Sequence, residues 1–468
     1  MGEGSHAADA LPRLVVAGLS GESGKTLISL ALLLEAVRRN IAVQAFKKGP
    51  DYIDAAWLEW ASCRPARNLD TYLMGFETAV RSFTRNASPC GLNLIEGNRG
   101  LYDGLDARGT HSTAELAKAL RAPVVLVINA TKVTRTAAAL VLGCQKLDPA
   151  VRIAGVIINQ AAGVRHARIV REAIESACDL PVLGVVPRAA AGAFVQMRHL
   201  GLTTPDEYPA RESLTANLLD LVAAHLEFGR LLDIARRAPP LSAPPAEPAN
   251  PAAGRGLTIG YLRDSAFSFY YPENLDALRA TGAQLVPVSA LAASRLPENM
   301  DALYIGGGFP ETHAEALSGN SELLGSIRRQ ARGGLPVYAE CGGLMLLSRA
   351  ILWRGKRYPM ADVLPFDVEV CGTPQGHGYT ELLVDRPNPF FAEGTCLKGH
   401  EFHYSRLLVD GAPPSTVCAV LRGTGCLEGR DAVVTGNTWA SYTHLHALAT
   451  PDWAGAVVNA ARSVQMAV

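Results

Sequence analysis

One cysteine, Cys341, stands where a strand is expected to turn into a helix. The segment AECGG at residues 339–343 directly follows the apolar residues 335–338. Such an elbow projects the side chain from the carboxyl edge of a parallel sheet, and its glycines let neighbouring backbone approach closely. A thiol in that position is typical of a nucleophile. The other cysteines lack an elbow, so we expect them to be packed or idle thiols.

A cysteine nucleophile needs a general base, and four histidines far along the chain are candidates. His400 and His403 occur in GHEFHYS, and His444 and His446 occur in ASYTHLH. Each pair could converge on one site, so zinc binding is an alternative. No cysteine or carboxylate stands at matching ligand spacing nearby, and we therefore favour a base over a metal ligand.

A glycine triplet at residues 306–308 is the candidate oxyanion hole. It follows the expected strand at residues 303–305, at the same sheet edge as the elbow. Backbone amides aimed at a developing negative charge stabilise the tetrahedral intermediate of acyl transfer. We predict that the amides of Gly307, Gly308 and Gly342 have this role, although a structural role for the glycines is compatible with the same pattern.

A second chemistry is indicated near the amino terminus by GLSGESGKT at residues 18–26, which precedes the helical pattern LISLALLLEAVRR. Backbone amides in such a loop bind phosphate oxygens, Lys25 would reach the β- and γ-phosphates, and the Thr26 hydroxyl would hold Mg²⁺. The first glycine stands one position early, which resembles the variant loop of dethiobiotin-synthetase-like enzymes. The residues expected to bind ATP in this loop are Gly21, Ser23, Gly24, Lys25 and Thr26.

Two acidic segments follow later expected strands: KKGPDYID at residues 47–54 and EGNRGLYDG at residues 96–104. Ligands of open α/β sheets bind at the carboxyl ends of the strands. Mg²⁺ takes oxygen ligands, often one or two carboxylates together with nucleotide phosphates, so Asp51 and Glu96 are the predicted metal ligands. Asn159, at the end of another expected strand, is placed to bind adenine with its amide; capping a helix is the alternative.

These groups require two sheets to position them. Short β-branched runs alternate with helical stretches on both sides of the Pro/Ala-rich segment 238–254, and both halves are predicted to be α/β, doubly wound parallel-sheet domains. The expected boundaries are 1–235 for a P-loop domain, 236–256 for a linker and 257–468 for a thiol hydrolase domain. The expected strands are residues 14–16, 43–46, 92–95, 124–128, 153–158, 258–262, 284–288, 302–305 and 336–339.

The bulk composition limits the partners. The chain has 468 residues, of which 44 are basic and 44 acidic, so its formal net charge is zero. The protein as a whole is therefore not attracted electrostatically to nucleic acid or to an anionic membrane. Scattered cysteines, an amino terminus without the apolar core of a signal peptide, and apolar runs too short to span a bilayer indicate a cytoplasmic protein. Small-molecule partners are expected, and a homodimer is left open.

The sequence resembles the cobyrinic acid a,c-diamide synthases, glutamine-dependent amidotransferases that act on tetrapyrroles. Eight motifs occur in order: GPDYID (49–54), EGNRGLYDG (96–104), STAELAK (112–118), FSFYYPENL (267–275), GGGFPE (306–311), AECGGLM (339–345), GHEFHYS (399–405) and ASYTHLH (440–446). The resemblance implies an amino-terminal dethiobiotin-synthetase-like P-loop domain and a carboxyl-terminal domain like the class I glutamine amidotransferases. In that class a glutamate follows the histidine by two residues; His446 stands there, so the third triad member is left open.

The resemblance also implies a coupled reaction. The first domain would transfer the γ-phosphoryl group of ATP to an acetate carboxylate, with Mg²⁺ and Lys25 stabilising charge. Cys341 would attack the side-chain amide of glutamine with His444 shuttling the proton, and released ammonia would then attack the acyl phosphate. The residues expected to hold the tetrapyrrole are Lys48, Tyr52, Asp54 and Asp103.

The substrate has alternatives. Lys48, Asn98 and Arg99 stand where cobyrinate-type members more often have apolar residues, and the AAW continuation of GPDYID also favours a siroheme- or nickel-sirohydrochlorin-amidating branch. A cobyric acid synthase or a cell-wall amidotransferase shares the layout, but HEFHYS and ASYTHLH favour the diamide synthases. A scaffold or metal chaperone with an inactive glutaminase domain is the non-enzyme alternative, against which the intact Cys341 and His444 argue.

Overall fold

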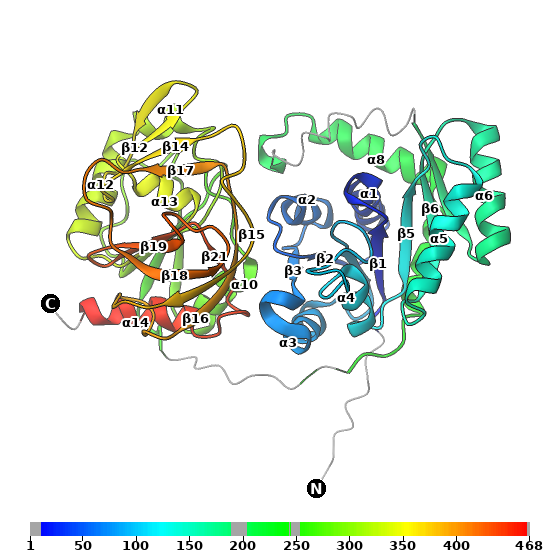
Figure 1. The fold of residues 1–468 in the computed structure, drawn as a ribbon, viewed down its shortest axis with the longest axis horizontal. Coiled ribbons are helices and arrows are strands. Elements are labelled where there is room, and N and C mark those ends of the chain that lie inside the picture. Colours follow the sequence, from blue (N-terminus) through cyan, green and yellow to red (C-terminus); the bar gives the residue numbers. More distant parts are fainter. Residues whose placement is uncertain (1–10, 189–203, 243, 245–252, 466–468) are drawn as a thin grey trace, which may run out of the picture. The chain divides into compact units, whose positions relative to one another are not determined.

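The computed structural model describes residues 11–188, 204–242, 244 and 253–465. The chain divides into two compact units, Met1–Ala246 and Glu247–Val468, and each is considered by itself (Figure 1). The centre of the predicted linker, residues 245–252, lies outside the described residues. Among the described residues, no helix is long and apolar enough to cross a membrane.

The first unit contains a seven-stranded sheet with the order β3-β2-β4-β1-β5-β6-β7. Every neighbouring pair is parallel, as the buried β-branched runs predicted. β1 is a central strand, flanked by β4 and β5. In open α/β sheets, ligands bind to the loops that follow the carboxyl ends of such central strands. The strands are β1 (Arg13–Gly18), β2 (Val43–Lys48), β3 (Arg67–Leu69), β4 (Leu92–Glu96), β5 (Val124–Asn129), β6 (Ile153–Ala161) and β7 (Val182–Pro187).

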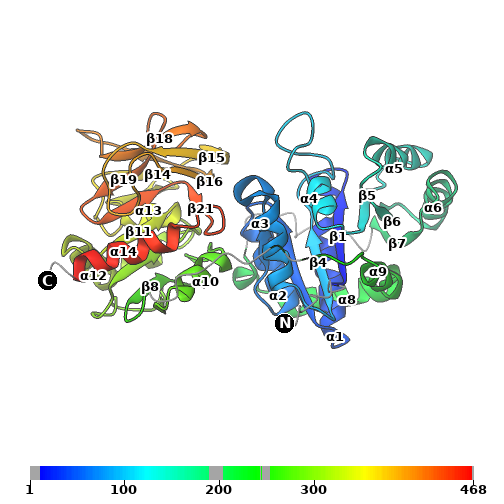
Figure 2. The same cartoon turned by 90° about the horizontal axis from the view of Figure 1, so that it is seen from below.

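Helices cover both faces of this sheet because its central strands are apolar on both sides. Leu14 and Val16 of β1 join a core cluster with side chains from α1, α2, α8 and α9, while Val15 and Ala17 are equally buried on the other face. Figure 2 shows α9 and α5 on opposite sides of the sheet. The helices are α1 (Lys25–Arg38), α2 (Ile53–Ser62), α3 (Thr71–Asn86), α4 (Thr113–Ala119), α5 (Arg135–Leu147), α6 (Val164–Cys178), α8 (Arg211–His225) and α9 (Phe228–Arg236).

The second unit combines a parallel and an antiparallel half in one ten-stranded sheet, with the order β21-β16-β15-β18-β19-β20-β11-β10-β8-β9. The strands from β20 to β9 are parallel, and those from β21 to β19 are antiparallel. The sequence predicted four strands of the parallel half and none of the antiparallel half. The strands are β8 (Thr258–Leu262), β9 (Gln284–Val288), β10 (Ala302–Ile305), β11 (Val337–Glu340), β15 (Gly376–Val384), β16 (Cys396–His403), β18 (Thr416–Arg422), β19 (Arg430–Thr435), β20 (Thr438–Ser441) and β21 (His444–Leu445).

Two apolar clusters sandwich the parallel half of this sheet. Ile305 and Val337 face a cluster that includes α12 and α13, whereas Tyr304 and Tyr338 face a cluster that includes α14. A separate four-stranded sheet packs beside the first cluster in the order β13-β12-β14-β17. The remaining elements are α10 (Pro272–Ala280), α11 (Ala314–Gly319), α12 (Ser321–Arg332), α13 (Gly342–Leu347), α14 (Trp453–Gln465), β12 (Ala350–Trp353), β13 (Lys356–Pro359), β14 (Asp367–Val370) and β17 (Ser405–Leu408).

The chain on either side of the predicted linker is packed against its own unit. Arg13 and Arg121 donate to the carbonyl oxygens of Pro239 and Pro240, so the first residues of the predicted 236–256 segment lie on the first unit. At the other end, the amide of Gly254 donates to Thr281 O at 2.8 Å in the second unit. The exact domain boundaries stay a prediction.

Candidate active sites

Cys341 occupies the junction between β11 and α13, as the elbow pattern predicted. Its backbone has φ 47° and ψ −100°, a strained conformation for a residue with a Cβ. The amide of Cys341 donates to Ser441 O at 2.7 Å, which ties the elbow to the end of β20. The side chain is buried, and this burial, reinforced by the charge of Glu311, raises the pKa of the Cys341 thiol. The thiol therefore needs a base close by to become a nucleophile.

The glycine triplet packs directly against the elbow. A Cβ added at Gly342 would stand 3.0 Å from the amide nitrogen of Gly308, and one added at Gly343 would stand 2.5 Å from Ile305 O. A Cβ at Gly307 would stand 2.6 Å from His444 Cε1. A larger residue at any of these positions would have to displace its neighbours. Gly307, Gly308 and Gly342 therefore share one neighbourhood with His444, and their oxyanion role stays a prediction.

His444 is held by a carboxylate from the strand that carries the nucleophile. Its Nδ1 lies 3.4 Å from Glu340 Oε2, and Glu340, the last residue of β11, is fully buried. His400 stacks on His444 with 5.0 Å between ring centroids. Burial, and next the nearby His444, lowers the pKa of His400 well below its usual range, so His400 is a neutral neighbour.

The other candidate histidines have different partners. His400 Nδ1 lies 3.2 Å from the Tyr271 hydroxyl. His403 stacks on Tyr442 with 3.7 Å between centroids, and its Nε2 lies 3.5 Å from Glu401. His446 Nε2 lies 3.6 Å from Glu273. Within the described ranges, no group of three or more His, Cys, Asp or Glu residues could hold a metal ion, so the zinc alternative gains no support.

In the first unit, residues 18–26 form the predicted loop between β1 and α1. Gly24 has φ 96°, and a Cβ there would stand 2.2 Å from Asn159 Nδ2. Asn159 Nδ2 instead donates to Ser23 O at 2.9 Å. The amide therefore holds the loop, a role that the sequence did not predict, and its contact with adenine stays a prediction.

Lys25 donates to backbone carbonyls of its own loop and of the loop after β4. Its Nζ donates to Ser20 O at 2.8 Å, Gly21 O at 3.2 Å and Arg99 O at 2.7 Å. Burial, followed by the charge of Lys47, lowers the pKa of Lys25 to about 8. An anionic ligand in the loop would offset both effects, because it supplies opposite charge to a desolvated cation.

The predicted metal ligands lie around Glu96. Thr26 Oγ1 donates to Glu96 Oε1 at 2.8 Å, and the buried Oε2 of Glu96 has no hydrogen-bond partner. An unpartnered carboxylate oxygen beside a hydroxyl fits a hard cation such as Mg²⁺. Asp51 accepts a bond from Asp54 N at 2.8 Å. Burial, and next the Asp54 carboxylate, raises the pKa of Asp51 to about 7.

Lys47 is a site residue that the sequence did not single out. Its buried ammonium group forms ion pairs with Asp54 and, at 2.8 Å, with Glu96 Oε1. The predicted Lys48 is also buried, and its burial lowers its pKa. A lysine inside a fully buried strand, next to two acidic loops, was the signal that could have identified Lys47 as the partner of those carboxylates.

The predicted tetrapyrrole ligands have contacts within the protein. Asp54 pairs with Lys47, and Asp103 Oδ2 accepts from Gly100 N at 2.8 Å. Tyr52 immediately precedes α2, and Lys48 ends β2. All four residues therefore lie at or shortly after the carboxyl ends of β2 and β4, and their contact with a macrocycle stays a prediction.

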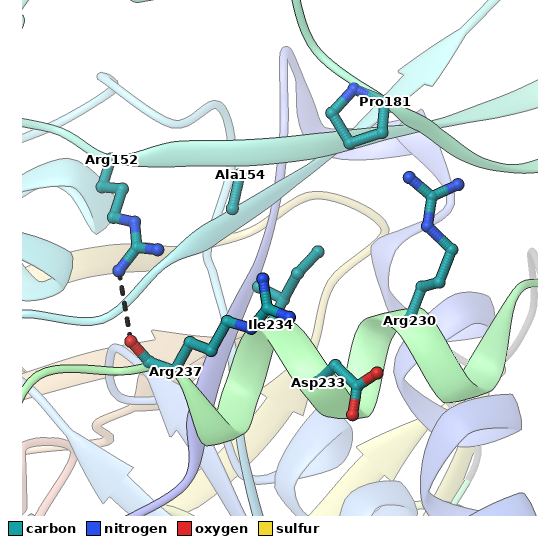
Figure 3. Close-up of a pocket in the computed structure, with 7 residues that line it drawn as sticks. All are labelled: Arg152, Ala154, Pro181, Arg230, Asp233, Ile234 and Arg237. Carbon is teal, nitrogen blue, oxygen red and sulfur yellow. Dashed lines mark hydrogen bonds between the residues drawn. The ribbon is translucent and has the colours of Figure 1, made fainter.

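A cavity of ≈ 320 Å³ lies in the first unit, at the amino-terminal ends of β6 and β7 (Figure 3). It lies between α9 and the residues just before β6 and β7, and Arg152, Arg230 and Arg237 line it. Arg152 donates to Arg237 O at 3.3 Å, and Arg230 pairs with Glu227 at 2.6 Å. Because the phosphate loop follows the carboxyl end of β1, whereas this cavity lies at the amino-terminal ends of β6 and β7, the cavity is separate from the phosphate site.

Two domain families match the chain. The CobQ/CobB/MinD/ParA nucleotide binding domain matches residues 14–202, and the CobB/CobQ-like glutamine amidotransferase domain matches residues 258–452. The cobyrinate a,c-diamide synthase of Magnetococcus marinus is 40% identical over 95% of this chain and 96% of its own. Those of Archaeoglobus fulgidus and Dehalococcoides mccartyi are 40% and 41% identical, over 94% and 95% of this chain and 95% and 96% of their own.

The chain belongs to the cobyrinate a,c-diamide synthase family. The family resemblance predicted from eight motifs is thereby confirmed, as is the order of a nucleotide-binding domain followed by a glutamine amidotransferase domain. In this family context, the elbow of Cys341 lies in the amidotransferase domain and the loop of Lys25 in the nucleotide-binding domain. The chain is accordingly a glutamine-hydrolysing ligase, and a scaffold with an inactive glutaminase domain finds no support.

Proposed function

We propose that this family member uses ATP and glutamine to convert peripheral acetate carboxylates of cobyrinate into amides. The observation that carries the proposal is full-length similarity, about 40%, to relatives named for this reaction, together with a glutaminase elbow in one unit and a phosphate loop in the other. A carboxylate does not react with ammonia directly because its leaving group would be oxide. Activation and ammonia production are thus both required, and the two sites have the residues for these two tasks.

In the glutaminase site, His444 takes the proton of the Cys341 thiol, and the sulfur attacks the side-chain carbonyl carbon of glutamine. The C–S bond forms while the carbonyl π electrons move to oxygen, where the amides of Gly307, Gly308 and Gly342 would stabilise the charge. The C–N bond then breaks, and the imidazolium returns its proton so that ammonia leaves. Water hydrolyses the thioester to glutamate and restores the thiol.

In the phosphate site, an acetate oxygen attacks the γ-phosphorus of ATP, ADP leaves and an acyl phosphate forms. Ammonia then attacks the acyl carbon, and inorganic phosphate leaves. The residues that support this step are Lys25, whose ammonium group would turn from the loop carbonyls to the phosphates, and Lys47, which holds Glu96 and Asp54 in place. Mg²⁺, held by Thr26, Glu96 and Asp51, would neutralise phosphate charge.

The loops proposed to bind the macrocycle follow β2 and β4. Lys48, Tyr52, Asp54 and Asp103 are proposed to contact the substrate there, with Asn159 beside the nucleotide. Siroheme stays an alternative because it presents similar peripheral acetates, but the names of the relatives favour the corrin.

The test is to incubate the purified full chain with ATP, Mg²⁺ and glutamine and, in separate reactions, cobyrinate or siroheme, and to analyse the products by mass spectrometry. We expect cobyrinate to acquire one or two amides, with matching formation of ADP and glutamate. Reactions without ATP, or without glutamine, are the controls and should leave cobyrinate unchanged. Amidation of siroheme alone would transfer the assignment to the siroheme branch, and amidation of neither would contradict the proposal.

A further inference from the structure

We propose that Glu340 is the carboxylate that positions His444 for proton transfer in glutamine hydrolysis. This inference rests on the proposed function. The sequence position two residues after His444 is occupied by His446 and therefore supplies no carboxylate. Glu340 approaches from a different element, β11, and immediately precedes the nucleophile in the chain. One strand end would thus provide both the thiol and the group that orients its base.

The contacts of Glu340 link it to both the ring and the backbone of β21. Oε2 lies 3.4 Å from His444 Nδ1, and Oε1 accepts a hydrogen bond from Leu445 N at 3.1 Å. The carboxylate therefore restrains the imidazole and the strand that carries it at the same time. Glu340 is fully buried, so its position is set by these contacts rather than by solvent.

Two tyrosines complete the surroundings of the carboxylate. Tyr338 OH donates to Oε1 at 3.2 Å, and Tyr304 OH donates to Oε2 at 3.4 Å. Burial, and next the charge of Glu340, raises the pKa of both tyrosines well above the usual range, which keeps the hydroxyls protonated as donors. A buried carboxylate is costly unless it is hydrogen-bonded, and four donors converge on this one.

The bond to Glu340 requires the proton of neutral His444 to be on Nδ1, which leaves the lone pair on Nε2. The Nε2 side of the ring faces the glycine triplet at residues 306–308. A Cβ added at Gly307 would stand 2.6 Å from His444 Cε1 and 3.4 Å from His444 Nε2. The basic nitrogen is therefore turned toward the glycines beside Cys341. When His444 accepts the thiol proton, the adjacent carboxylate stabilises the imidazolium, as the aspartate of a serine protease triad does.

The other charged and titratable groups around His444 do not provide this support. His400 from β16 is neutral and stacks on the ring. His446 accepts from Leu448 N at 3.1 Å through Nδ1, and its Nε2 faces Glu273 of α10 at 3.6 Å. Glu273 thus accompanies the second histidine of the segment as Glu340 accompanies the first, which makes it a matched control.

The experiment compares Glu340→Gln with Glu273→Gln in the full chain, by measuring glutamate release during complete reactions. For Glu340→Gln we expect kcat to fall at least about 100-fold with the KM for glutamine within about threefold, because the amide cannot stabilise the imidazolium. Glu273→Gln should keep kcat within about threefold.

A second pair of variants separates positioning from folding. Glu340→Gln in a His444→Ala background should cause no further loss, because both changes disable the same step. If Glu340→Gln fails to show a cooperative melting transition, Glu340→Asp decides: the shorter carboxylate should lower kcat only about tenfold. Wild-type kcat in either Glu340 variant would overturn the inference. Absence of glutamate release by the wild-type chain would instead contradict the proposed function.

Discussion

The two candidate sites differ in how their charged groups are partnered within the protein. In the second unit, Glu340, Cys341 and Gly342 follow one another at a strand end, and His444 already contacts the carboxylate. In the first unit, Lys25 donates to carbonyls of its own loop and to Arg99 O, and Glu96 Oε2 has no hydrogen-bond partner. In the glutaminase site, the charged groups are paired with partners from the same unit. In the phosphate site, buried like charges lie close together, and we expect a nucleotide and a cation to offset them.

The largest expected effect comes from removing the nucleophile, which should separate the two sites completely. With Cys341→Ala, we expect glutamine-driven amidation to fall on the order of 10⁴-fold or more, because no thioester can form. With ammonium chloride replacing glutamine, amidation should continue within about threefold of wild type. Product formation from each nitrogen source is the measurement. Retention of glutamine-driven amidation would show that Cys341 is not the nucleophile.

A smaller effect is expected when the phosphate site loses the hydroxyl oxygen of Thr26. Thr26→Val keeps the shape of the side chain but removes the hydroxyl that contacts Glu96. We expect ammonia-driven amidation at fixed Mg²⁺ to fall about 100-fold and the Mg²⁺ concentration for half-maximal rate to rise. A Mg²⁺ titration of the ammonia-driven reaction measures both. Thr215→Val, at a half-buried position of α8, is the control.

The pH dependence should differ between the sites because Asp51 has a raised pKa of about 7. Below that value the carboxyl is protonated in the folded protein, so protons compete with Mg²⁺; above it the carboxylate is available. We expect the half-maximal Mg²⁺ concentration to rise by up to about tenfold per pH unit as pH falls below 7. Asp51→Asn should weaken Mg²⁺ dependence at pH 8 and abolish the pH trend. An unchanged trend in that variant would exclude Asp51 as the titrating ligand.

The smallest effect concerns Asn159, which holds the phosphate loop through Ser23. Asn159→Ala removes the bond to Ser23 O and leaves that buried carbonyl without its donor. We expect the free energy of unfolding of the first unit to fall by about 1–3 kcal/mol and ATP affinity to fall a few-fold. Denaturant unfolding and nucleotide titration measure these quantities. A large loss of ATP affinity with unchanged stability would favour the adenine contact over the loop-holding role.

Features that a few consecutive residues determine could be predicted from the sequence, whereas features that depend on pairing between distant segments could not. The Cys341 elbow and the GESGKT loop are encoded by a few consecutive residues that set backbone geometry, and both were found where predicted. The antiparallel strands of the second unit, such as β16 and β18, were not predicted. Their side chains are only partly apolar, and their pairing joins segments distant in sequence, so no run of residues identifies the partner.

The sequence by itself determined the reaction class and the family, because the chemistry of a thiol elbow and a phosphate loop is carried by residue types at fixed local spacing. Only the tertiary structure decided which side chains from elsewhere in the chain contact the residues of these two sites. Glu340 meets His444 across 104 residues, Asn159 meets Ser23 across 136, and Lys47 rather than its neighbour Lys48 pairs with Glu96. Such contacts depend on strand order, side-chain direction and burial, which are properties of the packed chain as a whole.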